Sequence, residues 1–468
     1  MKKRPNLLFI LTDDQGAWAL HCAGNGDIRT PNLDRLAEQG TRFENFFCAS
    51  PVCSPARASI LTGRIPSQHG VHDWIRSGSL DKKSLGEHAN HPYFASEDVP
   101  IQYLQGLTTY PDLLAARDYT CALSGKWHLG DSVHPQHGFS HWYTIGRGGC
   151  LYNQADVIED GRLHFETRYI TDLITEHALG YLDEFAGQEN PFYISVHYTA
   201  PHDPWDEDQH PAQFYDLYRD CAFTATPDEP LHPNRIPTAP GGTGEERKRL
   251  LGGERAQSGL AEDTLVVFTA DNGMNMGHHG IWGKGNGTFP FNLFDTAVKV
   301  PFITRWPGHI PGGRVASSMC SHYDIIQTVN DLFELGADLP DDLPGHSFAD
   351  VLLGGADTDN HVVILDEYGN SRMIRNREWK YIHRYPYGPH ELYHLTADPG
   401  EKENLVDRPE YAPVRQQLLD ALQKWYYTYA SPAVDGSREA VTGFGQMRRP
   451  GIYSEGKPVY ADSPKYQK

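Results

Sequence analysis

Residues 50–64 of the chain read SPVCSPARASILTGR, and this stretch places a cysteine just ahead of a predicted helix. Residues 55–61 are predicted to be helical, because proline is favoured in the first turn of a helix. Cys53 then lies at the helix N-terminus, where free backbone N–H groups favour an anion. Arg57 lies one turn further on and is predicted to reach back toward residue 53. The alternatives are a buried apolar cysteine or an ordinary thiol nucleophile, and an arginine in a surface ion pair.

Apolar runs on both sides of this stretch predict strands that are buried on both faces. The runs are residues 6–11, 120–123, 191–197 and 264–269. Helical patterns lie between them, at residues 32–39, 110–117 and 167–185. Strands that alternate with helices predict an α/β fold, with a large, mostly parallel mixed sheet that helices cover on both sides.

Polar side chains follow each predicted strand. Ligands of open α/β sheets bind beyond the carboxyl ends of the strands, so these side chains are expected to share one composite site. In chain order they are Asp13 and Asp14, Lys126 and His128, His202, and Asp271 and Asn272.

The predicted secondary structure changes near residue 360, from long buried strands and helices to short strands joined by turns. Residues 361–368, 371–375, 379–384 and 391–395 read as short strands joined by turns, and residues 410–427 read as a helix. We therefore predict a catalytic domain over residues 1–358. A smaller C-terminal α+β subdomain with an antiparallel sheet and a helix is predicted over residues 359–430. Residues 431–468 are predicted to form a tail packed on the body.

Composition excludes several classes of partner. The net charge is −20, from 61 acidic and 41 basic residues, which argues against nucleic acid and anionic membranes as partners. No apolar run is long enough to span a bilayer. The apolar run at residues 7–11 is short and is followed by two aspartates, so it predicts a strand and not a signal peptide. Seven scattered cysteines favour reduced thiols and a cytoplasmic location.

The carboxylates at two strand ends predict a metal site. Asp13, Asp14, Asp271 and Asn272 offer hard oxygen ligands, which Ca²⁺ favours and Mg²⁺ also accepts. Few histidines fall in these motifs, which weakens a zinc interpretation. The structural alternative is that both motifs are ordinary turns.

Four segments together resemble the type I sulfatases of the alkaline phosphatase superfamily. They are residues 50–64, SGKWHLG at 124–130, TAPH at 199–202 and GIWGK at 280–284. Further matching segments run from about residue 6 to about residue 405. The resemblance implies a sulfuric ester hydrolase with an alkaline-phosphatase-like sheet. It also implies that a formylglycine-generating maturation enzyme oxidises Cys53 to Cα-formylglycine, whose hydrated aldehyde is the nucleophile.

The resemblance also assigns roles to individual residues. It implies a divalent cation, usually calcium, at the four oxygen ligands named above. It implies that Arg57 steadies the formylglycine hydrate and that Lys126 binds a sulfate oxygen. His128 is implied to hydrogen-bond the hydrate and to deprotonate it when sulfate leaves. His202 and Lys284 are expected near the sulfate and the leaving oxygen, where either is a candidate general acid.

Two alternatives belong beside the sulfatase interpretation. The first is a phosphonate monoester hydrolase or phosphodiesterase of the same superfamily. The second is a catalytically silent glycan-binding homologue. The Lys-Trp-His and Pro-His segments favour a sulfatase, and a phosphatase of this superfamily would more often carry Ser or Thr as nucleophile with zinc ligands.

Loops outside these motifs are expected to select the substrate. The candidate regions are residues 69–74, 77–105 and 203–259, and we expect the last two to be largely irregular. We expect a sulfated carbohydrate, such as a small saccharide derived from a glycosaminoglycan. A simple core role is the alternative for Trp74, and the sequence leaves homo-oligomer formation open. The candidate contact residues are His72, Asp73, Trp74, Arg76, Trp205 and His279.

Overall fold

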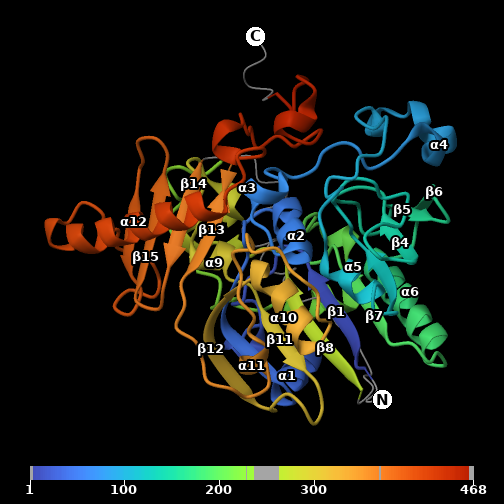
Figure 1. The fold of residues 1–468 in the computed structure, drawn as a ribbon, viewed down its shortest axis with the longest axis horizontal. Helices are drawn as coiled ribbons and strands as arrows, with labels where there is room; N and C mark the ends of the chain where they lie inside the picture. The colour runs from blue at the N-terminus through green and yellow to red at the C-terminus, as the bar shows by residue number, and fades with distance from the viewer. Residues whose placement is uncertain (1–3, 228, 237–262, 368–369, 463–468) are drawn as a thin grey trace.

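The computed structural model describes residues 4–227, 229–236, 263–367 and 370–462. A ten-stranded mixed sheet crosses the molecule in the order β12-β2-β11-β8-β1-β7-β3-β4-β5-β6 (Figure 1). Its strands are β1 (Asn6–Thr12), β2 (Thr41–Phe47), β3 (Thr120–Gly125), β4 (His141–Ile145), β5 (Ala155–Glu159), β6 (Arg162–Glu166), β7 (Phe192–His197), β8 (Thr264–Ala270), β11 (Phe302–Arg305) and β12 (Arg314–Ser321).

Strand β1 shows why the centre of the sheet forms. Leu7, Phe9 and Leu11 belong to one apolar cluster, while Leu8 and Ile10 belong to another on the opposite face. Since successive side chains of a strand point to opposite faces, both faces of β1 are buried. β1 pairs in parallel with β7 and β8, and β3 pairs in parallel with β7 and β4. The predicted α/β class with a mostly parallel mixed sheet is confirmed.

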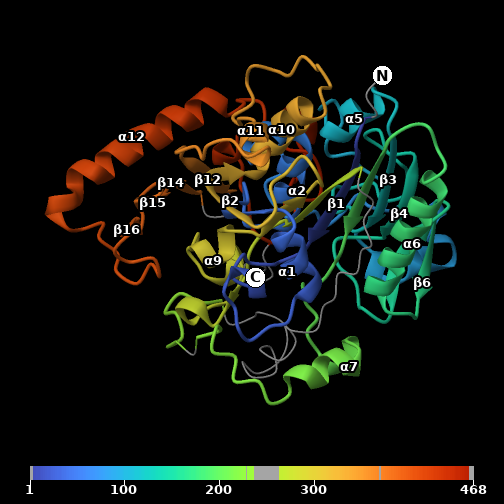
Figure 2. The ribbon, with the colours of Figure 1, turned by 90° about the horizontal axis from the view of Figure 1, so that it is seen from below.

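Helices cover both faces of the sheet, as Figure 2 shows from a second direction. The cluster around Phe9 includes residues of α2, α5, α10 and α11, and the cluster around Ile10 includes residues of α1 and α6. The helices are α1 (Pro31–Glu38), α2 (Cys53–Thr62), α3 (Pro66–His69), α4 (Lys82–Leu85), α5 (Tyr110–Ala115), α6 (Ile170–Phe185), α7 (Ala212–Tyr215), α9 (Asp295–Val298), α10 (Ile325–Leu332), α11 (Ala349–Leu352) and α12 (Ala412–Tyr429).

A second sheet follows in the C-terminal part of the chain. It is antiparallel in the order β13-β14-β15-β16, and α12 packs against it. In Figure 1 and Figure 2, α12 lies at the opposite edge of the molecule from α6. The predicted C-terminal sheet and helix are confirmed, although residue 368 of the first predicted strand lies outside the described residues. The strands are β13 (Val362–Asp366), β14 (Ser371–Arg375), β15 (Trp379–Arg384) and β16 (Glu391–His394).

The two regions expected to be irregular differ from that expectation in detail. Residues 77–105 contain α4 and two short 3₁₀ turns, and the Asp81 side chain caps α4 by accepting a hydrogen bond from Ser84 N. The second region contains α7 and a 3₁₀ turn on each side of it, and residues 237–262 lie outside the description. No helix in the described part of the chain combines the length and apolar character needed to cross a membrane.

Gly63 ends α2 against α10, and its replacement provides a test of this packing. Its φ is +66°, and a Cβ at this position would lie 2.2 Å from Ile326 Cγ2. We expect Gly63→Ala to lower the free energy of unfolding by about 1–3 kcal/mol more than Gly308→Ala, because only the first overpacks the core. Gly308 is the matched control, since its φ is +74° and nothing lies within 4 Å of its Cβ position. Equal losses in denaturant titrations would contradict the expected clash.

Candidate active site

Four neighbouring strands deliver the polar side chains to one edge of the sheet. β8, β1, β7 and β3 are adjacent and parallel, so their carboxyl ends lie together. Asp13 and Asp14 follow β1 directly, Asp271 and Asn272 follow β8, and Lys126 follows β3. His202 comes five residues after the end of β7, so these predicted site residues converge as the topology requires.

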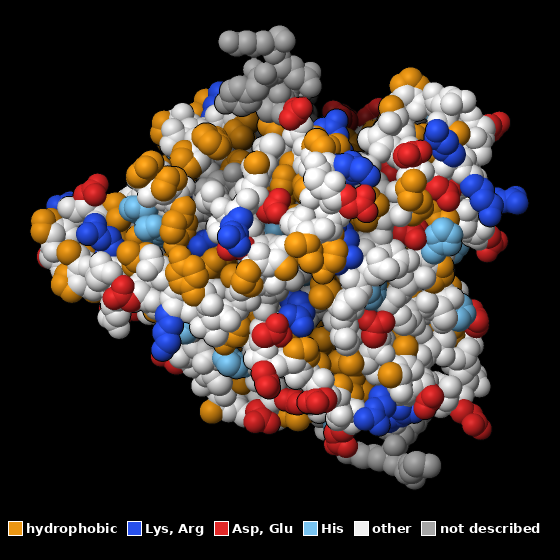
Figure 3. Space-filling model, turned by 45° about the horizontal axis from the view of Figure 1, so that its top comes forward, with side chains coloured by type: hydrophobic (Ala, Val, Ile, Leu, Met, Phe, Trp, Pro, Cys, Tyr) orange, Lys and Arg blue, Asp and Glu red, His pale blue; other side chains and the backbone are white. Residues whose placement is uncertain are grey.

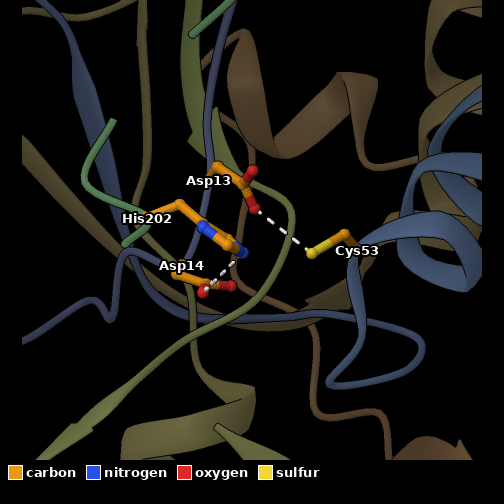
Figure 4. Close-up of side chains that lie close together, drawn as sticks. All are labelled: Asp13, Asp14, Cys53 and His202. Carbon is orange, nitrogen blue, oxygen red and sulfur yellow. Dashed lines mark hydrogen bonds and ion pairs between the residues drawn. The ribbon is translucent and has the colours of Figure 1, made fainter. Parts of the chain in front are cut away.

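Cys53 is the first residue of α2, and every residue of this helix is buried. Val52 precedes the helix in an extended conformation, which turns the Cys53 side chain toward the ends of the strands. The Cys53 thiol donates a hydrogen bond to Asp13 Oδ1 at 3.3 Å, and Lys284 Nζ lies 2.8 Å from its sulfur. Figure 4 shows the sulfur facing Asp13 while Asp14 and His202 close the other side.

Asp13 and Asp14 form a compact set with Cys53 and His202, of which only His202 is partly exposed. One ligand atom each of Asp13, Asp14, Cys53 and His202 lies within 4.8 Å of the others. Asn272 Nδ2 donates to Asp14 Oδ1 at 2.7 Å, and the backbone N–H of Asp14 donates to one oxygen of the Asp271 carboxylate at 3.1 Å. Asp14 has a φ of +63°, an uncommon conformation that directs its carboxylate into the set.

These residues fit a divalent cation with hard oxygen ligands. Asp13, Asp14 and Asp271 are buried carboxylates, and Asn272 Oδ1 is buried with no hydrogen-bond partner among the residues the structure describes. A buried acceptor without a donor carries a desolvation cost that a bound cation removes. Three carboxylates and an amide oxygen suit calcium or magnesium, whereas zinc prefers nitrogen and sulfur ligands.

Three cations offset the acidic groups, of which Arg57 and Lys126 are buried and Lys284 is partly exposed. Arg57 Nε donates to Asp271 Oδ2 at 2.9 Å, Lys126 is paired with Asp13, and Lys284 Nζ lies 2.6 Å from Asp14 Oδ1. Burial disfavours the charged form of Lys126, but the Asp13 carboxylate holds the pKa of this lysine above its ordinary value. Arg57 is buried and is therefore not a surface ion-pair partner.

The positive charge for an anionic ligand is thus supplied inside the molecule. On the face shown in Figure 3, acidic and basic side chains are interspersed over the described residues. Arg57, Lys126 and Lys284 place positive charge beside the carboxylates of the site, although the net charge of the chain is −20.

His128 is buried and is positioned as a neutral imidazole. Its Nε2 lies 3.0 Å from the carbonyl oxygen of Ile75, and because a carbonyl only accepts, Nε2 carries the proton. Its Nδ1 is therefore an acceptor, and it has no partner in the described ranges. Burial, followed by the charges of Lys126 and Arg57, lowers the pKa of His128 well below its ordinary value.

His202 is the more accessible of the two site histidines. Its side chain is 20% exposed, and its Nε2 lies 3.6 Å from Asp14 Oδ2. Its Nδ1 lies 2.8 Å from the carbonyl oxygen of Asp203, which orients the ring. Burial opposes protonation of His202, but the Asp14, Asp13 and Asp203 carboxylates raise its pKa to about 10. A partly exposed, protonated imidazole beside Asp14 is suited to donate a proton to a substrate oxygen.

Two of the predicted substrate residues are not accessible. His72 is 1% exposed and its Nε2 donates to the carbonyl of Val434, while Asp73 is fully buried and accepts a hydrogen bond from Gly445 N. The prediction that both contact a sugar is therefore corrected. The physical reason is that the C-terminal tail covers this turn, which the local sequence does not reveal.

The other predicted substrate residues divide into two groups. Trp74 is half-buried beside Val52, the residue just ahead of Cys53, and Arg76 is exposed next to it. Trp205 is buried in a separate apolar cluster, and its Nε1 donates to the carbonyl of Pro201. His279 stacks on Phe294 with ring centroids 3.7 Å apart. Of these residues, Trp74 is partly exposed and packs against the cluster that contains Val52, and Arg76 follows it two positions later.

The sequence motifs do not identify some of the residues that hold the site residues in place. Ile75 N donates to Ser54 Oγ at 3.0 Å, so the backbone of one residue holds both the start of α2 and His128. Gly148 packs against the His128 ring, because a Cβ there would lie 2.0 Å from Nε2. These contacts use backbone atoms, so no side-chain pattern in the sequence marks them.

Comparison with known proteins identifies the family to which the chain belongs. Residues 5–335 match the family model described as Sulfatase, which is more than half of the 468 residues. The chain belongs to the sulfatase family. Residues 277–427 of this sulfatase also match the model described as N-sulphoglucosamine sulphohydrolase, C-terminal. The expectation of a sulfuric ester hydrolase is confirmed.

Relatives match this sulfatase over most of its length. Arylsulfatase A of Bos taurus is 30% identical over 478 residues, covering 90% of this chain and 87% of that protein. N-acetylglucosamine-6-O-sulfatase of Bacteroides thetaiotaomicron is 26% identical over 542 residues, covering 95% of this chain and 90% of that protein.

Solved structures support the fold. A protein in complex with its substrate D-glucosamine-2-N,6-O-disulfate aligns with a TM-score of 0.70 at 24% identity, over 93% of this chain and all of that chain. The phosphonate monoester hydrolase of Agrobacterium radiobacter aligns with a TM-score of 0.60 at 21% identity, over 91% of this chain and 96% of that chain. The fold is therefore shared by enzymes that act on sulfate and on phosphonate esters.

Proposed function

We propose that this sulfatase removes a sulfate group from a small saccharide, with a formylglycine made from Cys53 as the source of its nucleophile and with calcium bound by Asp13, Asp14, Asp271 and Asn272. The observation that carries the proposal is the position of Cys53. It begins a buried helix and lies between a carboxylate on Asp13 and the ammonium group of Lys284.

The two added groups would supply chemistry that the ordinary side chains lack. The formylglycine hydrate would offer a hydroxyl that is a nucleophile toward sulfur. The cation would polarise the sulfate oxygens and that hydroxyl as a Lewis acid.

The remaining steps belong to the protein's own side chains. Lys126 and Lys284 stabilise the negative charge that builds up on the sulfate oxygens in the transition state. His202 Nε2 donates a proton to the departing alcohol oxygen, since its ring is partly exposed. His128 Nδ1 accepts a proton from the group on residue 53, because its other nitrogen is already a donor to Ile75. Arg57 holds the Asp271 carboxylate in place.

A saccharide substrate is supported by relatives and by the rim of the site. The relatives named N-acetylglucosamine-6-O-sulfatase and N-acetylgalactosamine-6-sulfatase are both named for sulfated amino sugars. Trp74 offers an amphipathic ring beside Val52, and Arg76 offers a charged group next to it. Aromatic rings with a nearby hydrogen-bonding group suit the apolar face and hydroxyls of a sugar.

Mass spectrometry of the tryptic peptide that carries residue 53 tests the proposal. The protein is produced with a formylglycine-generating enzyme, and the peptide is expected to be lighter than the thiol form and to react with a hydrazide probe. The same sample is expected to hydrolyse an aryl sulfate faster than an aryl phosphonate. An unmodified thiol in the presence of a competent maturase would contradict the proposed nucleophile. A preference for the phosphonate would favour the alternative enzyme class.

Trp74→Ala tests the saccharide. We expect KM for a sulfated amino-sugar disaccharide to rise about tenfold, since stacking of one aromatic side chain contributes about 0.5–1.5 kcal/mol beyond its buried area. KM for a small aryl sulfate is expected to change less than about twofold, because that substrate is too short to need the ring. Trp425→Phe, which packs against the cluster of the C-terminal sheet and α12, is the control. An equal effect on both substrates would argue against a sugar contact at Trp74.

A further inference from the structure

The C-terminal tail lies against the catalytic centre, although neither family model extends beyond residue 427. Residues 445–447 pair with residues 459–461 through backbone bonds between Met447 and Val459 and between Ala461 and Gly445. The same stretch pairs in parallel with Ile75 through Gln446. The tail therefore adds two short extended segments to the one that carries Trp74, Ile75 and Arg76.

Residues 74–76 have two edges that face different parts of the protein. Ile75 N donates to Ser54 Oγ at 3.0 Å, and Ile75 O accepts from His128 Nε2 at 3.0 Å. On the other edge, Trp74 O accepts from Gln446 N at 2.8 Å, and Arg76 N donates to Gln446 O at 2.9 Å. Backbone groups of successive residues in an extended segment point to opposite edges, so the pairing with Gln446 directs the Ile75 groups toward the site.

The Gln446 side chain fixes this pairing. It is fully buried, and its Oε1 accepts from His72 N at 2.9 Å and from Asp73 N at 3.3 Å. Its Nε2 donates to Gly70 O at 2.9 Å and to Arg448 O at 3.0 Å. All the hydrogen-bonding capacity of the amide is used on backbone groups, three of which belong to the turn that leads into residue 74.

We infer that Gln446 is a positioning residue for His128, acting through the Ile75 carbonyl that holds the Nε2–H tautomer of this histidine. The orientation of that carbonyl decides which ring nitrogen carries the proton, because the hydrogen bond at one nitrogen selects the other as acceptor. Gly148 packs against the His128 imidazole from another side, so the ring has little room to rotate. The choice of tautomer is the main freedom that remains. The tail thus supports the catalytic centre through Gln446, which lies 374 residues from His72 along the chain and binds its backbone N–H.

The test combines nitrogen NMR of the histidine rings with kinetics. Histidine-selective ¹⁵N labelling of the protein with unconverted Cys53 reports the tautomer, and His128→Gln identifies the signal. In Gln446→Leu we expect the Nε2–H signature of His128 to be replaced by a mixture of tautomers. In converted protein we expect kcat for an aryl sulfate to fall about 10- to 100-fold, the usual cost of losing an orienting hydrogen bond, with KM within about twofold.

Matched variants keep the inference open to refutation. Thr442→Val removes a hydrogen bond within the tail, from Thr442 Oγ1 to Ala461 O, and is expected to leave both the His128 signal and kcat unchanged. If Gln446→Leu does not fold, Gln446→Asn, which retains both the acceptor and the donor of the amide on a shorter side chain, is expected to give a smaller change of the same kind. A His128 signal identical to that of the wild type would overturn the inference, whatever happens to kcat. The kinetic part of the test rests on the proposed function, because it assumes the proposed role of His128. The NMR spectrum requires no turnover. It therefore distinguishes failure of this inference from failure of the proposed function.

Discussion

Cys53→Ala is expected to lower kcat for an aryl sulfate at least about 10⁴-fold, because loss of a covalent nucleophile removes the main reaction path and leaves only electrostatic assistance. The variant is expected to fold, since Cys53 is one small side chain at the start of α2 and Ser54 still binds Ile75 N. Steady-state kinetics and the hydrazide reaction are measured on the same samples, and both signals are expected to vanish together.

Two other cysteines provide the control for this prediction. Cys22 and Cys221 are half-buried and lie outside the site, so Cys22→Ala and Cys221→Ala are expected to retain activity within about twofold. Burial and the charge of Asp34 raise the pKa of the Cys22 thiol to about 11, so this thiol is a weak nucleophile at neutral pH. If Cys53→Ala kept substantial activity, a direct attack by another group or by water would replace the proposed nucleophile.

Asp14→Asn is expected to have the second largest effect. Asp14 Oδ1 contacts Lys284 Nζ at 2.6 Å and Asn272 Nδ2 at 2.7 Å, so this carboxylate joins a proposed cation ligand to the proposed catalytic lysine. The amide keeps the size but removes one charge. We expect calcium affinity to fall at least about 100-fold, since even outer ligands of metal sites contribute 10- to 100-fold. We expect kcat for an aryl sulfate to fall together with the calcium affinity.

Calorimetric titration of chelator-treated protein with Ca²⁺ and with Mg²⁺ measures this effect. Activity of the wild type is expected to disappear on chelation and to return with calcium. Asp34→Asn is the control, because Asp34 Oδ1 accepts from Cys22 N and Thr30 Oγ1 in a part-buried position and contacts none of the proposed cation ligands in these bonds. Unchanged calcium binding by Asp14→Asn would place the cation elsewhere, and better restoration by magnesium would correct the proposed metal.

The strands that build the site could be predicted because they are buried on both faces. Such strands read as continuous apolar runs, and the polar residues just beyond them fall at known points of a parallel sheet. The run before Asp13 and the run before Asp271 became β1 and β8, which are neighbours in the sheet. The convergence of Asp13, Asp271 and Lys126 thus followed from periodicity and topology.

The substrate residues could not be predicted in the same way. His72 and Asp73 look like polar loop residues, yet both are buried by residues 434–446. Their burial depends on contacts between segments more than 360 residues apart along the chain. Local composition does not show which distant segment covers a turn. The polar character of His72 and Asp73 therefore does not indicate that these side chains are accessible to solvent.

The sequence by itself determined the α/β architecture, the family and the position of the proposed nucleophile. Each depends on short-range patterns, in which neighbouring residues share a strand, a turn or a helix end. Only the tertiary structure decided the surroundings of His128, the burial of His72 and the contact of Gln446 with the backbone of residues 72–76. Those features depend on which backbone segments pair with one another. Nearly every residue type carries the same backbone N–H and C=O groups, so the sequence does not show which segments pair.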